Sequence, residues 1–563
     1  MPFSTSAEAP APQARRPLRV GILLDSWQVA AWVDRVVRDV EESGIARVEL
    51  VMLNGAAPGR RSFLPLRVWR RRRFLLYDLY SRLDRLLFPL RPDPFHRVSL
   101  APRLGDRALL RVTPRQSKHG DSLVDDDVAR IRSHDLDVAL RFGFRILRGA
   151  ALRIARYGVW SYHHDDNLAI RGGPPGFWEV MESHPTTGSV LQVLGERLDA
   201  GEVLYRSWSP THRRSVHRNK GHVYWKSTAF VLRQLRAIAE AGAEGAVARG
   251  AAGAYLPYCG RLYRKPSNRE FAPLLWRFGR RAGGEKLDEM LRPRYWRIEY
   301  SFADEVADVP EQELFRFAAL EPPADRWWAD PFPWSNEAGH WIFLEEYLLG
   351  ERKGRISAVS IDRMGRATPP QPVLERPYHL SHPFLVRWKG ELFLIPESAQ
   401  NRTVEAYRCR SFPDEWELET ELLCGARAVD ATLLDAGNEW WMFVNAARDE
   451  ATHCHDELHL YWAASPLGPW RPHRRNPVKS DARSSRPAGA LFRHRGDLLR
   501  PAQDCSHRYG HSISIQRVLR LDRDELREEE VARIEPRWRS RLLATHTVNR
   551  CGRLTVVDAM SVR

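Results

Sequence analysis

The sequence predicts an α/β domain built on a parallel sheet, followed by an all-β five-bladed propeller. The first prediction rests on apolar runs that alternate with amphipathic stretches, and the second on a fivefold repeat of short strands. A chain of 563 residues is also long enough for more than one core. We expect a disordered tail over 1–16, the α/β domain over 17–235, a helical linker over 236–295 and the propeller over 296–563.

The α/β prediction begins with PLRVGILLDS at 17–26, an apolar run that ends in Ser and Asp. An amphipathic stretch follows, and a second apolar run occupies 46–54, so the order strand, helix, strand favours a parallel sheet. Further strands are expected at 136–144 and 158–164, and a helix at 223–249 that closes the domain. The Arg- and Pro-rich stretch 54–125 predicts an inserted region of helix and loops.

The propeller prediction rests on a polar position that recurs at intervals of 52, 48, 56 and 60 residues. Each recurrence is followed by a strand, a Gly-containing turn and a second strand that ends in a polar residue. Five such units fit five small antiparallel sheets whose first strands line a central channel. The recurring positions are Asp330, His382, Asp430, Arg486 and His546, and the second strands end at Glu345, Glu397, Asn445, Asp504 and Asp558.

The chain carries a net charge of +16, which by itself suggests a nucleic-acid partner. Arg contributes 79 of the basic residues and Lys only 8, an imbalance that a coding bias explains better than a phosphate-binding face. The basic run 67–74 is interleaved with apolar residues and is typical of a solvated helix face. We therefore expect no specific nucleic acid, with RNA binding through the Arg-rich faces kept as an alternative. A peripheral membrane contact through the basic and aromatic segment 67–90 is kept as a further alternative.

The six cysteines form no CxxC pair, which is typical of reduced thiols in a cytoplasmic protein. The N-terminal segment has no apolar core of a signal peptide, and no apolar stretch is long enough for a transmembrane segment. The cluster HCHDE at 453–457 has ligand residue types at a spacing that suits zinc poorly, so no metal is expected. A homodimer stays open.

The segment 158–204 contains the residues that point to chemistry. Its first strand ends in His163, the position that ligand-binding residues take in an open parallel sheet. Asp199 opens a later strand of the same sheet and can lie beside His163. A His–Asp pair at a strand end predicts a general acid/base.

Four blocks of this segment resemble the core of the folate-dependent formyltransferases, the group that contains methionyl-tRNA formyltransferase and the sugar N-formyltransferases. The resemblance extends over roughly 17–235. It implies a Rossmann-like fold, 10-formyl-tetrahydrofolate as formyl donor and an amine as acceptor. The blocks are Ser161-Tyr162-His163, Arg171-Gly172-Gly173-Pro174-Pro175, Thr187-Gly188 and Leu198-Asp199-Ala200-Gly201.

The resemblance also implies residue roles. His163 would polarise the formyl carbonyl and protonate the departing folate nitrogen. Asp199 would orient and charge-compensate the imidazole, or take the proton from the attacking amine through water. Ser161 stands where the family has an Asn that donates to the oxyanion, and the loss of one such donor typically costs about 100–1000-fold in rate. Three alternatives stay open: Ser161 reaches the oxyanion, a neighbour such as His164 or Asn167 substitutes, or the domain is catalytically weak. Further expected roles are pterin binding by Leu140, Phe142, Gly143 and Asp199, and substrate binding by Arg171, Gly172 and Thr187.

The second half resembles the propellers of glycoside hydrolase family forty-three and, more closely, the propeller of glucosamine inositolphosphorylceramide transferases. The hydrolase resemblance implies Asp330 as a base and Glu397 as an acid, with Asp430 between them. Because the second domain resembles carbohydrate-handling proteins, we expect an amino sugar, a sugar nucleotide or a glycoconjugate as the formyl acceptor. The alternative is a carbohydrate-binding or glycoside-hydrolysing propeller joined to a degenerate formyltransferase domain.

Overall fold

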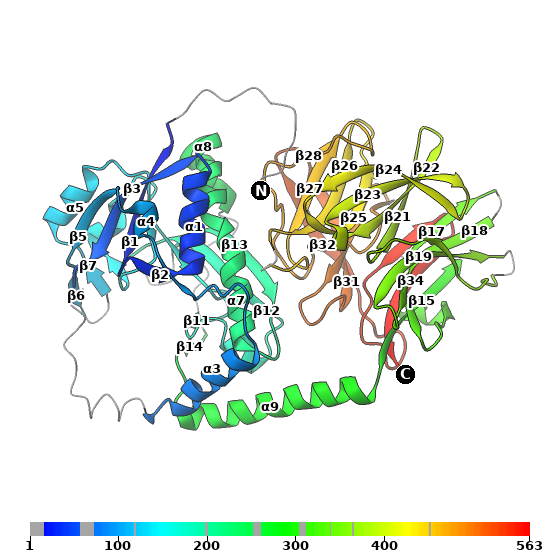
Figure 1. Ribbon diagram of the computed structural model, residues 1–563, viewed down its shortest axis with the longest axis horizontal. Coiled ribbons are helices and arrows are strands. Elements are labelled where there is room, and N and C mark those ends of the chain that lie inside the picture. Colours follow the sequence, from blue (N-terminus) through cyan, green and yellow to red (C-terminus); the bar gives the residue numbers. More distant parts are fainter. Residues whose placement is uncertain are drawn as a thin grey trace. The chain divides into compact units, whose positions relative to one another are not determined.

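The structure is a computed structural model, and it describes residues 16–56, 72–117, 120–196, 201–250, 260–302, 311–337, 339–362, 365–449 and 452–563. The chain divides between residues 282 and 283 into two compact parts, here called the α/β unit and the five-sheet unit (Figure 1). Ile238 and Phe271, from the stretch 236–295 that is expected as a helical linker, are buried in cores of the α/β unit. The tail predicted over 1–16 lies outside the described residues, apart from Arg16.

A seven-stranded sheet forms the centre of the α/β unit, in the order β13-β12-β10-β8-β1-β3-β5. The last five strands of this order are parallel, whereas β12 and β13 are antiparallel to their neighbours. The four strands expected from the sequence are present, so this prediction is confirmed. They are apolar because helices pack on both faces of the sheet. The strands are β1 (Leu18–Leu24), β3 (Ala46–Asn54), β5 (Ala108–Val112), β8 (Val138–Arg141), β10 (Val159–His163), β12 (Thr186–Val193) and β13 (Glu202–Pro210).

Helices α1 and α8 cover one face of this sheet, and α5 covers the other. The helix expected over 223–249 is in fact two helices, α7 and α8, which are separated at Thr228. The helices are α1 (Ala31–Glu42), α4 (Ala101–Leu104), α5 (Asp125–Arg132), η1 (Gly149–Arg153), α6 (Trp178–Glu182), α7 (Val216–Ser227) and α8 (Ala229–Gly250). Short paired strands are β2 (Gln28–Ala30) with β4 (Arg97–Ser99), β6 (Arg115–Ser117), β7 (Gly120–Ser122) and β9 (Leu147–Arg148), and β11 (Arg171–Gly172) with β14 (Leu262–Tyr263).

Two further helices, α3 (Leu75–Leu87) and α9 (Asn268–Leu291), lie side by side (Figure 1). The ring of Tyr80 packs edge-on against Phe271, with centroids 5.5 Å apart. The Asn268 side chain accepts a hydrogen bond from the Leu76 backbone at 3.0 Å, and the Lys265 ammonium lies 2.6 Å from Asp78. These contacts hold α3 on the α/β unit by one of its faces.

The described part of the five-sheet unit contains five four-stranded antiparallel sheets, the number that the repeat predicts. One sheet joins the two ends of the unit, because β15 pairs with β34 along nine residues. The sheets are β16-β15-β34-β33, β17 to β20, β21 to β24, β25 to β28 and β29 to β32. Their strands are β15 (Arg294–Phe302), β16 (Ala318–Leu320), β17 (Arg326–Asn336), β18 (Gly339–Leu348), β19 (Lys353–Ile361), β20 (Gln371–Leu374), β21 (Ser381–Trp388), β22 (Glu391–Ser398), β23 (Thr403–Ser411), β24 (Glu415–Cys424), β25 (Arg427–Asp435), β26 (Trp440–Ala447), β27 (Leu458–Ala463), β28 (Arg471–Pro472), β29 (Phe492–His494), β30 (Asp497–Asp504), β31 (Ser512–Leu521), β32 (Leu526–Ile534), β33 (Val548–Cys551) and β34 (Leu554–Val562), with short helical turns η2 (Glu311–Arg316) and η3 (Ala399–Asn401).

A β-bulge interrupts the first strand of three of these sheets at the repeated polar position. The pairing shifts between Ala329 and Phe332 in β17, and shifts in the same way in β21 and β25. Asp330, His382 and Asp430 occupy these bulges with φ of 49°, 46° and 55°. Positive φ is strained for residues with a side chain, and such strain is characteristic of functional positions.

Candidate functional site

Two groups of polar side chains are candidates for a functional site, one in each unit. The first lies at the carboxyl ends of the parallel strands in the α/β unit. Strand β10 ends at His163, its neighbour β8 ends at Arg141, and β1, on the other side of β8, ends at Leu24. The chain order reverses between β8 and β1, and open α/β sheets bind ligands at such a switch point.

Ser161 and Arg141 form a contact that the sequence analysis did not anticipate. They are paired in the parallel register of β10 and β8. The Ser161 hydroxyl oxygen accepts hydrogen bonds from Arg141 Nε at 3.1 Å and Nη2 at 2.8 Å. Arg141 Nη1 also donates to the carbonyls of Phe144 and Arg145, both at 3.3 Å. Arg141 therefore joins the expected oxyanion residue to the loop that follows β8.

This loop contains Phe142 and Gly143, two of the residues expected to bind the pterin ring. A Cβ at Gly143 would lie 2.4 Å from the Asp25 backbone nitrogen, so only glycine allows the approach of the two loops. The Asp25 carboxylate accepts a hydrogen bond from the Phe144 backbone at 2.8 Å. Phe142 is half-buried beside Trp32, whereas Leu140 is 2% exposed within the core. The loop is thus fixed at the switch point.

The remaining residues expected at this site hold the loop between β10 and α6. Arg171 is buried, and its Nε donates to the Asn167 carbonyl at 2.7 Å. Gly172 has φ 114°, and a Cβ there would lie 2.0 Å from the Tyr263 carbonyl oxygen. The buried Thr187 hydroxyl contacts the Thr211 hydroxyl at 2.9 Å. Asp199 lies outside the described residues, so its pairing with His163 stays a prediction.

Sequence reasoning missed a buried carboxyl pair formed by Asp165 in this loop and Glu179 on α6. Burial raises the pKa of Asp165 well above its usual range, and Glu179 adds to the rise. Burial likewise raises the pKa of Glu179 to about 7. Asp165 also accepts a hydrogen bond from the Gly176 backbone at 2.7 Å. Asp165 lies two residues after His163 in the sequence HHDDN. This proximity to the predicted catalytic histidine could have identified Asp165 as a site residue.

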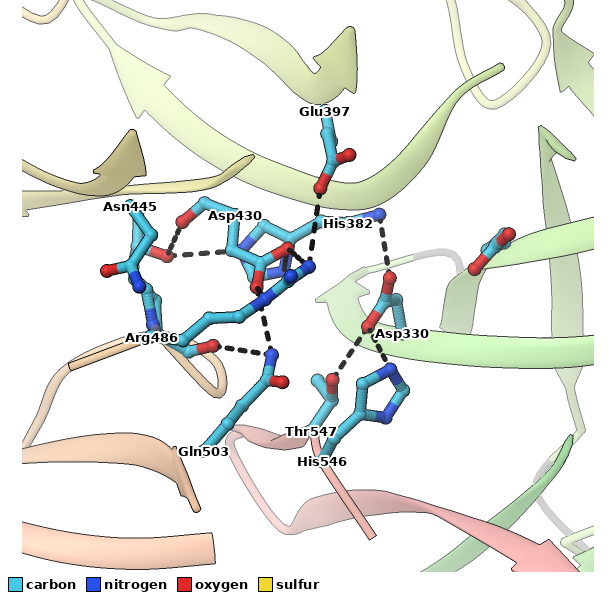
Figure 2. A network of polar contacts seen from close by, with 12 residues as sticks. Asp330, His382, Glu397, Asp430, Asn445, Arg486, Gln503, His546 and Thr547 are labelled. Atoms are coloured by element: carbon cyan, nitrogen blue, oxygen red, sulfur yellow. Dashed lines mark hydrogen bonds and ion pairs between the residues drawn. The ribbon is translucent and has the colours of Figure 1, made fainter. Parts of the chain in front are cut away.

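The second candidate site lies at the centre of the five-sheet unit, where side chains from all five sheets meet (Figure 2). The five recurring residues predicted from the repeat gather here, and all are buried. The Asp330 carboxylate accepts from the His382 backbone at 3.1 Å and from the Thr547 hydroxyl at 2.8 Å. His546 Nε2 lies 3.4 Å from the same carboxylate. Asp330 therefore connects three sheets.

Asp430 is held by Arg486 in a two-point ion pair (Figure 2). The distances from the guanidinium to the two carboxylate oxygens are 2.5 and 3.1 Å, and Gln503 donates to Asp430 at 2.9 Å. Burial alone would raise the pKa of Asp430, but Arg486 and His382 outweigh burial and hold this pKa at about 2. Asp430 is therefore ionised and fully paired.

Glu345 and Glu397 occupy equivalent positions in neighbouring sheets, paired with Ala329 and Ser381. Burial raises the pKa of both carboxyls well above the usual range, and neighbouring acids, first Asp330 for Glu345 and Asp430 for Glu397, raise each further. Arg486 lies 3.7 Å from Glu397, and His379 lies 3.6 Å from Glu345. The centre thus contains a carboxyl whose pKa is lowered, Asp430, together with two whose pKa is raised, Glu345 and Glu397. Glu345 was recognised as part of the repeat but not as a site residue.

Asp330, His546 and Asp558 are grouped closely enough to hold a metal ion, with one ligand atom of each within 4.8 Å of the others. Asp558 already accepts three backbone N–H groups, from Asp330 at 3.2 Å, His546 at 2.8 Å and Thr547 at 3.0 Å. Its Oδ2 also lies 2.6 Å from His546 Nδ1. Through these contacts the three side chains join neighbouring strands, and this structural role requires no metal ion.

A family model described as the N-terminal part of glucosamine inositolphosphorylceramide transferase 1 matches residues 320–545. The transferase of that name from Oryza sativa subsp. japonica is 31% identical over 206 residues, which are 36% of this chain and 28% of the relative. The chain thus spans less than a third of that relative. Methionyl-tRNA formyltransferase from Bacillus licheniformis is 29% identical over 132 residues, 23% of this chain and 41% of the relative.

Two solved structures are partly similar. A family 117 glycoside hydrolase from Zobellia galactanivorans has a TM-score of 0.31 at 12% identity, over 48% of this chain and 90% of the hydrolase. Glycinamide ribonucleotide transformylase 1 from Symbiobacterium toebii has a TM-score of 0.29 at 15% identity, over 42% of this chain and 93% of the other. In sequence, the chain is similar to transferases of these two kinds.

Proposed function

We propose that the protein is an enzyme that transfers a formyl group from 10-formyl-tetrahydrofolate to the amine of an amino sugar or sugar conjugate. The observation that carries the proposal is the position of His163 at the carboxyl end of β10, next to the switch point between β8 and β1. The sequence similarity to methionyl-tRNA formyltransferase supports the reaction class. A location in the cytoplasm and a homodimer stay proposals.

The residues at the switch point fit a folate donor. The loop after β8 is braced by Arg141 and Asp25, so its backbone and the Phe142 ring are held in place before a ligand binds. The donor, when bound, supplies a formyl group on a nitrogen that can leave. His163 would polarise the formyl carbonyl and protonate the departing folate nitrogen, and the positively charged Arg141 guanidinium donates a hydrogen bond to the Ser161 hydroxyl. That charge compensates for the Asn that Ser161 replaces in the family pattern.

We infer that the five sheets form a closed five-bladed propeller, because β15 and β34 join its two ends in one sheet. Its centre serves to bind carbohydrate. The carboxyls of Glu345 and Glu397, whose pKa is raised, can donate hydrogen bonds to sugar hydroxyls when they are protonated. Tyr509 exposes 39% of its surface beside Arg486. The similarity to glucosamine inositolphosphorylceramide transferase supports an amino sugar as its ligand.

Glycoside hydrolysis at this centre is the second candidate. The low pKa of Asp430 beside the raised pKa of Glu397 is the contrast that a base and an acid need. However, Asp430 is occupied by Arg486 and Gln503, and Asp330 by Thr547 and the His382 backbone. Neither carboxylate is left open to activate water, which favours binding over hydrolysis.

Calorimetric titration with 5-formyl-tetrahydrofolate, a stable analogue of the donor, tests the proposal. We expect saturable one-to-one binding by the full chain. The variant His163→Ala is expected to keep most of this binding and to lose formyl transfer to glucosamine by at least about 100-fold. His184→Ala, a half-buried histidine after α6, is the matched control. Absence of binding by a folded sample would refute the folate proposal and leave the propeller as the functional part.

A further inference from the structure

Helix α3 carries a stripe of leucines on a face that the described residues leave exposed. Leucines at spacings of three and four residues lie on one side of a helix. An apolar stripe of this kind usually faces a core, and contiguous exposed apolar surface marks an interaction site. The exposed fractions are 55% for Leu75, 55% for Leu79, 48% for Leu83, 77% for Leu86 and 72% for Leu87.

The opposite face of α3 packs against the rest of the α/β unit. Tyr77 and Tyr80 contact Phe271 on α9, and Asp84 is 5% exposed. The leucine stripe is therefore a second apolar face and is not needed to attach the helix. A helix that is apolar on two faces requires a partner for the second one.

The charge around this stripe is positive. Arg82 and Arg85 are exposed on α3, and Arg72 and Arg73 are exposed just before it. The two acids of the helix are both engaged: Asp78 is 2.6 Å from the Lys265 ammonium, and Asp84 accepts from the His217 backbone at 2.7 Å. The exposed face of α3 thus presents leucines and arginines together.

We propose that α3 docks the protein on an anionic lipid membrane, with its leucines in the outer acyl region and its arginines against lipid phosphates. An apolar face bordered by basic residues is the pattern of helices that lie in a membrane interface. Pairing with a second copy would bring the same arginines together, and like charges oppose that arrangement. The membrane docking goes beyond the proposed formyl transfer and does not depend on it.

Flotation of the full chain with lipid vesicles tests this proposal. We expect binding to phosphatidylcholine vesicles that contain phosphatidylserine, little binding to phosphatidylcholine alone, and weaker binding at high salt. The triple variant Leu79→Glu/Leu83→Glu/Leu86→Glu should lower the membrane-bound fraction roughly tenfold or more, because charged groups replace the inserted apolar ones. The matched control Leu349→Glu/Leu418→Glu/Leu519→Glu makes the same charge change at leucines that are 47%, 46% and 44% exposed in the five-sheet unit. It should retain most of the binding.

Three results would overturn the proposal. One is failure of the wild-type chain to float with phosphatidylserine vesicles at low salt. Another is an equal loss of binding in the α3 variant and in the control, which would indicate a general charge effect. The third is a dimer in sedimentation velocity that the α3 variant abolishes, which would show that a second copy covers the stripe. Circular dichroism of both variants checks that each is folded.

Discussion

The two candidate sites place charge in opposite ways. At the centre of the five-sheet unit, Asp430 is buried but paired with Arg486, and its pKa stays at about 2. In the α/β unit, Glu179 is equally buried beside another carboxyl, Asp165, and its pKa rises to about 7. The comparison teaches that burial alone does not decide protonation, because a fixed cation outweighs it. The contrast holds for these two carboxyls, since Glu345 and Glu397 at the centre also have a raised pKa.

The largest expected effect comes from removal of the anion at the centre. Asp430→Ala leaves the buried Arg486 without its carboxylate, and loss of one partner of a buried pair costs about 3–5 kcal/mol. We expect the unfolding transition of the five-sheet unit in denaturant to shift accordingly. Asp524→Ala removes the exposed partner of Arg474 and should cost less than about 1 kcal/mol. Equal shifts in the two variants would contradict the comparison.

The next effect concerns Glu179, the carboxyl that is buried beside another carboxyl, Asp165. Because the pKa of Glu179 rises from 4.5 to about 7 on folding, the folded state holds a proton that the unfolded state releases in this window. Stability contributed by this proton is present below pH 4.5 and is lost as the pH rises through 7. Glu179→Gln should thus be roughly 2–3 kcal/mol more stable than wild type at pH 8 and similar at pH 4. The prediction would be refuted if the difference in stability between Glu179→Gln and wild type did not change with pH. It would also be refuted if Glu182→Gln, on the same helix, gained the same stability.

A smaller effect is expected at the loop after β8. Arg141→Met removes the hydrogen bonds to Ser161 and to the Phe144 carbonyl, so the loop after β8 loses these supports. We expect the affinity for 5-formyl-tetrahydrofolate to fall roughly tenfold. The exposed Arg153→Met should leave it unchanged. An unchanged affinity in Arg141→Met would show that the loop is fixed without this side chain.

The smallest effect concerns the neutral carboxyls at the centre. Glu397→Gln replaces one donor by another of the same size, so we expect binding of glucosamine, measured by NMR titration, to weaken by only about threefold. The exposed Glu391→Gln on the same strand is the control. A complete loss of glucosamine binding would mean that Glu397 acts in its ionised form, as a base or an anion.

Hydrophobic patterning predicted the elements better than the contacts. The four strands expected in the α/β unit are present, whereas β5 was missed because only Val112 of this edge strand is buried. The fivefold repeat correctly predicted five sheets. The contact of Ser161 with Arg141 could not be predicted, because it depends on the parallel register of two strands that are 20 residues apart.

The sequence by itself determined the two classes of fold, the position of His163 at a strand end and the recurrence of polar residues in five sheets. These follow from local periodicity and turn residues, which depend on neighbours along the chain. Only the tertiary structure decided which acids are paired with a cation and which have a raised pKa. The reason is that Arg486 comes 56 residues after Asp430, and Glu179 reaches Asp165 only when the loop after β10 folds back.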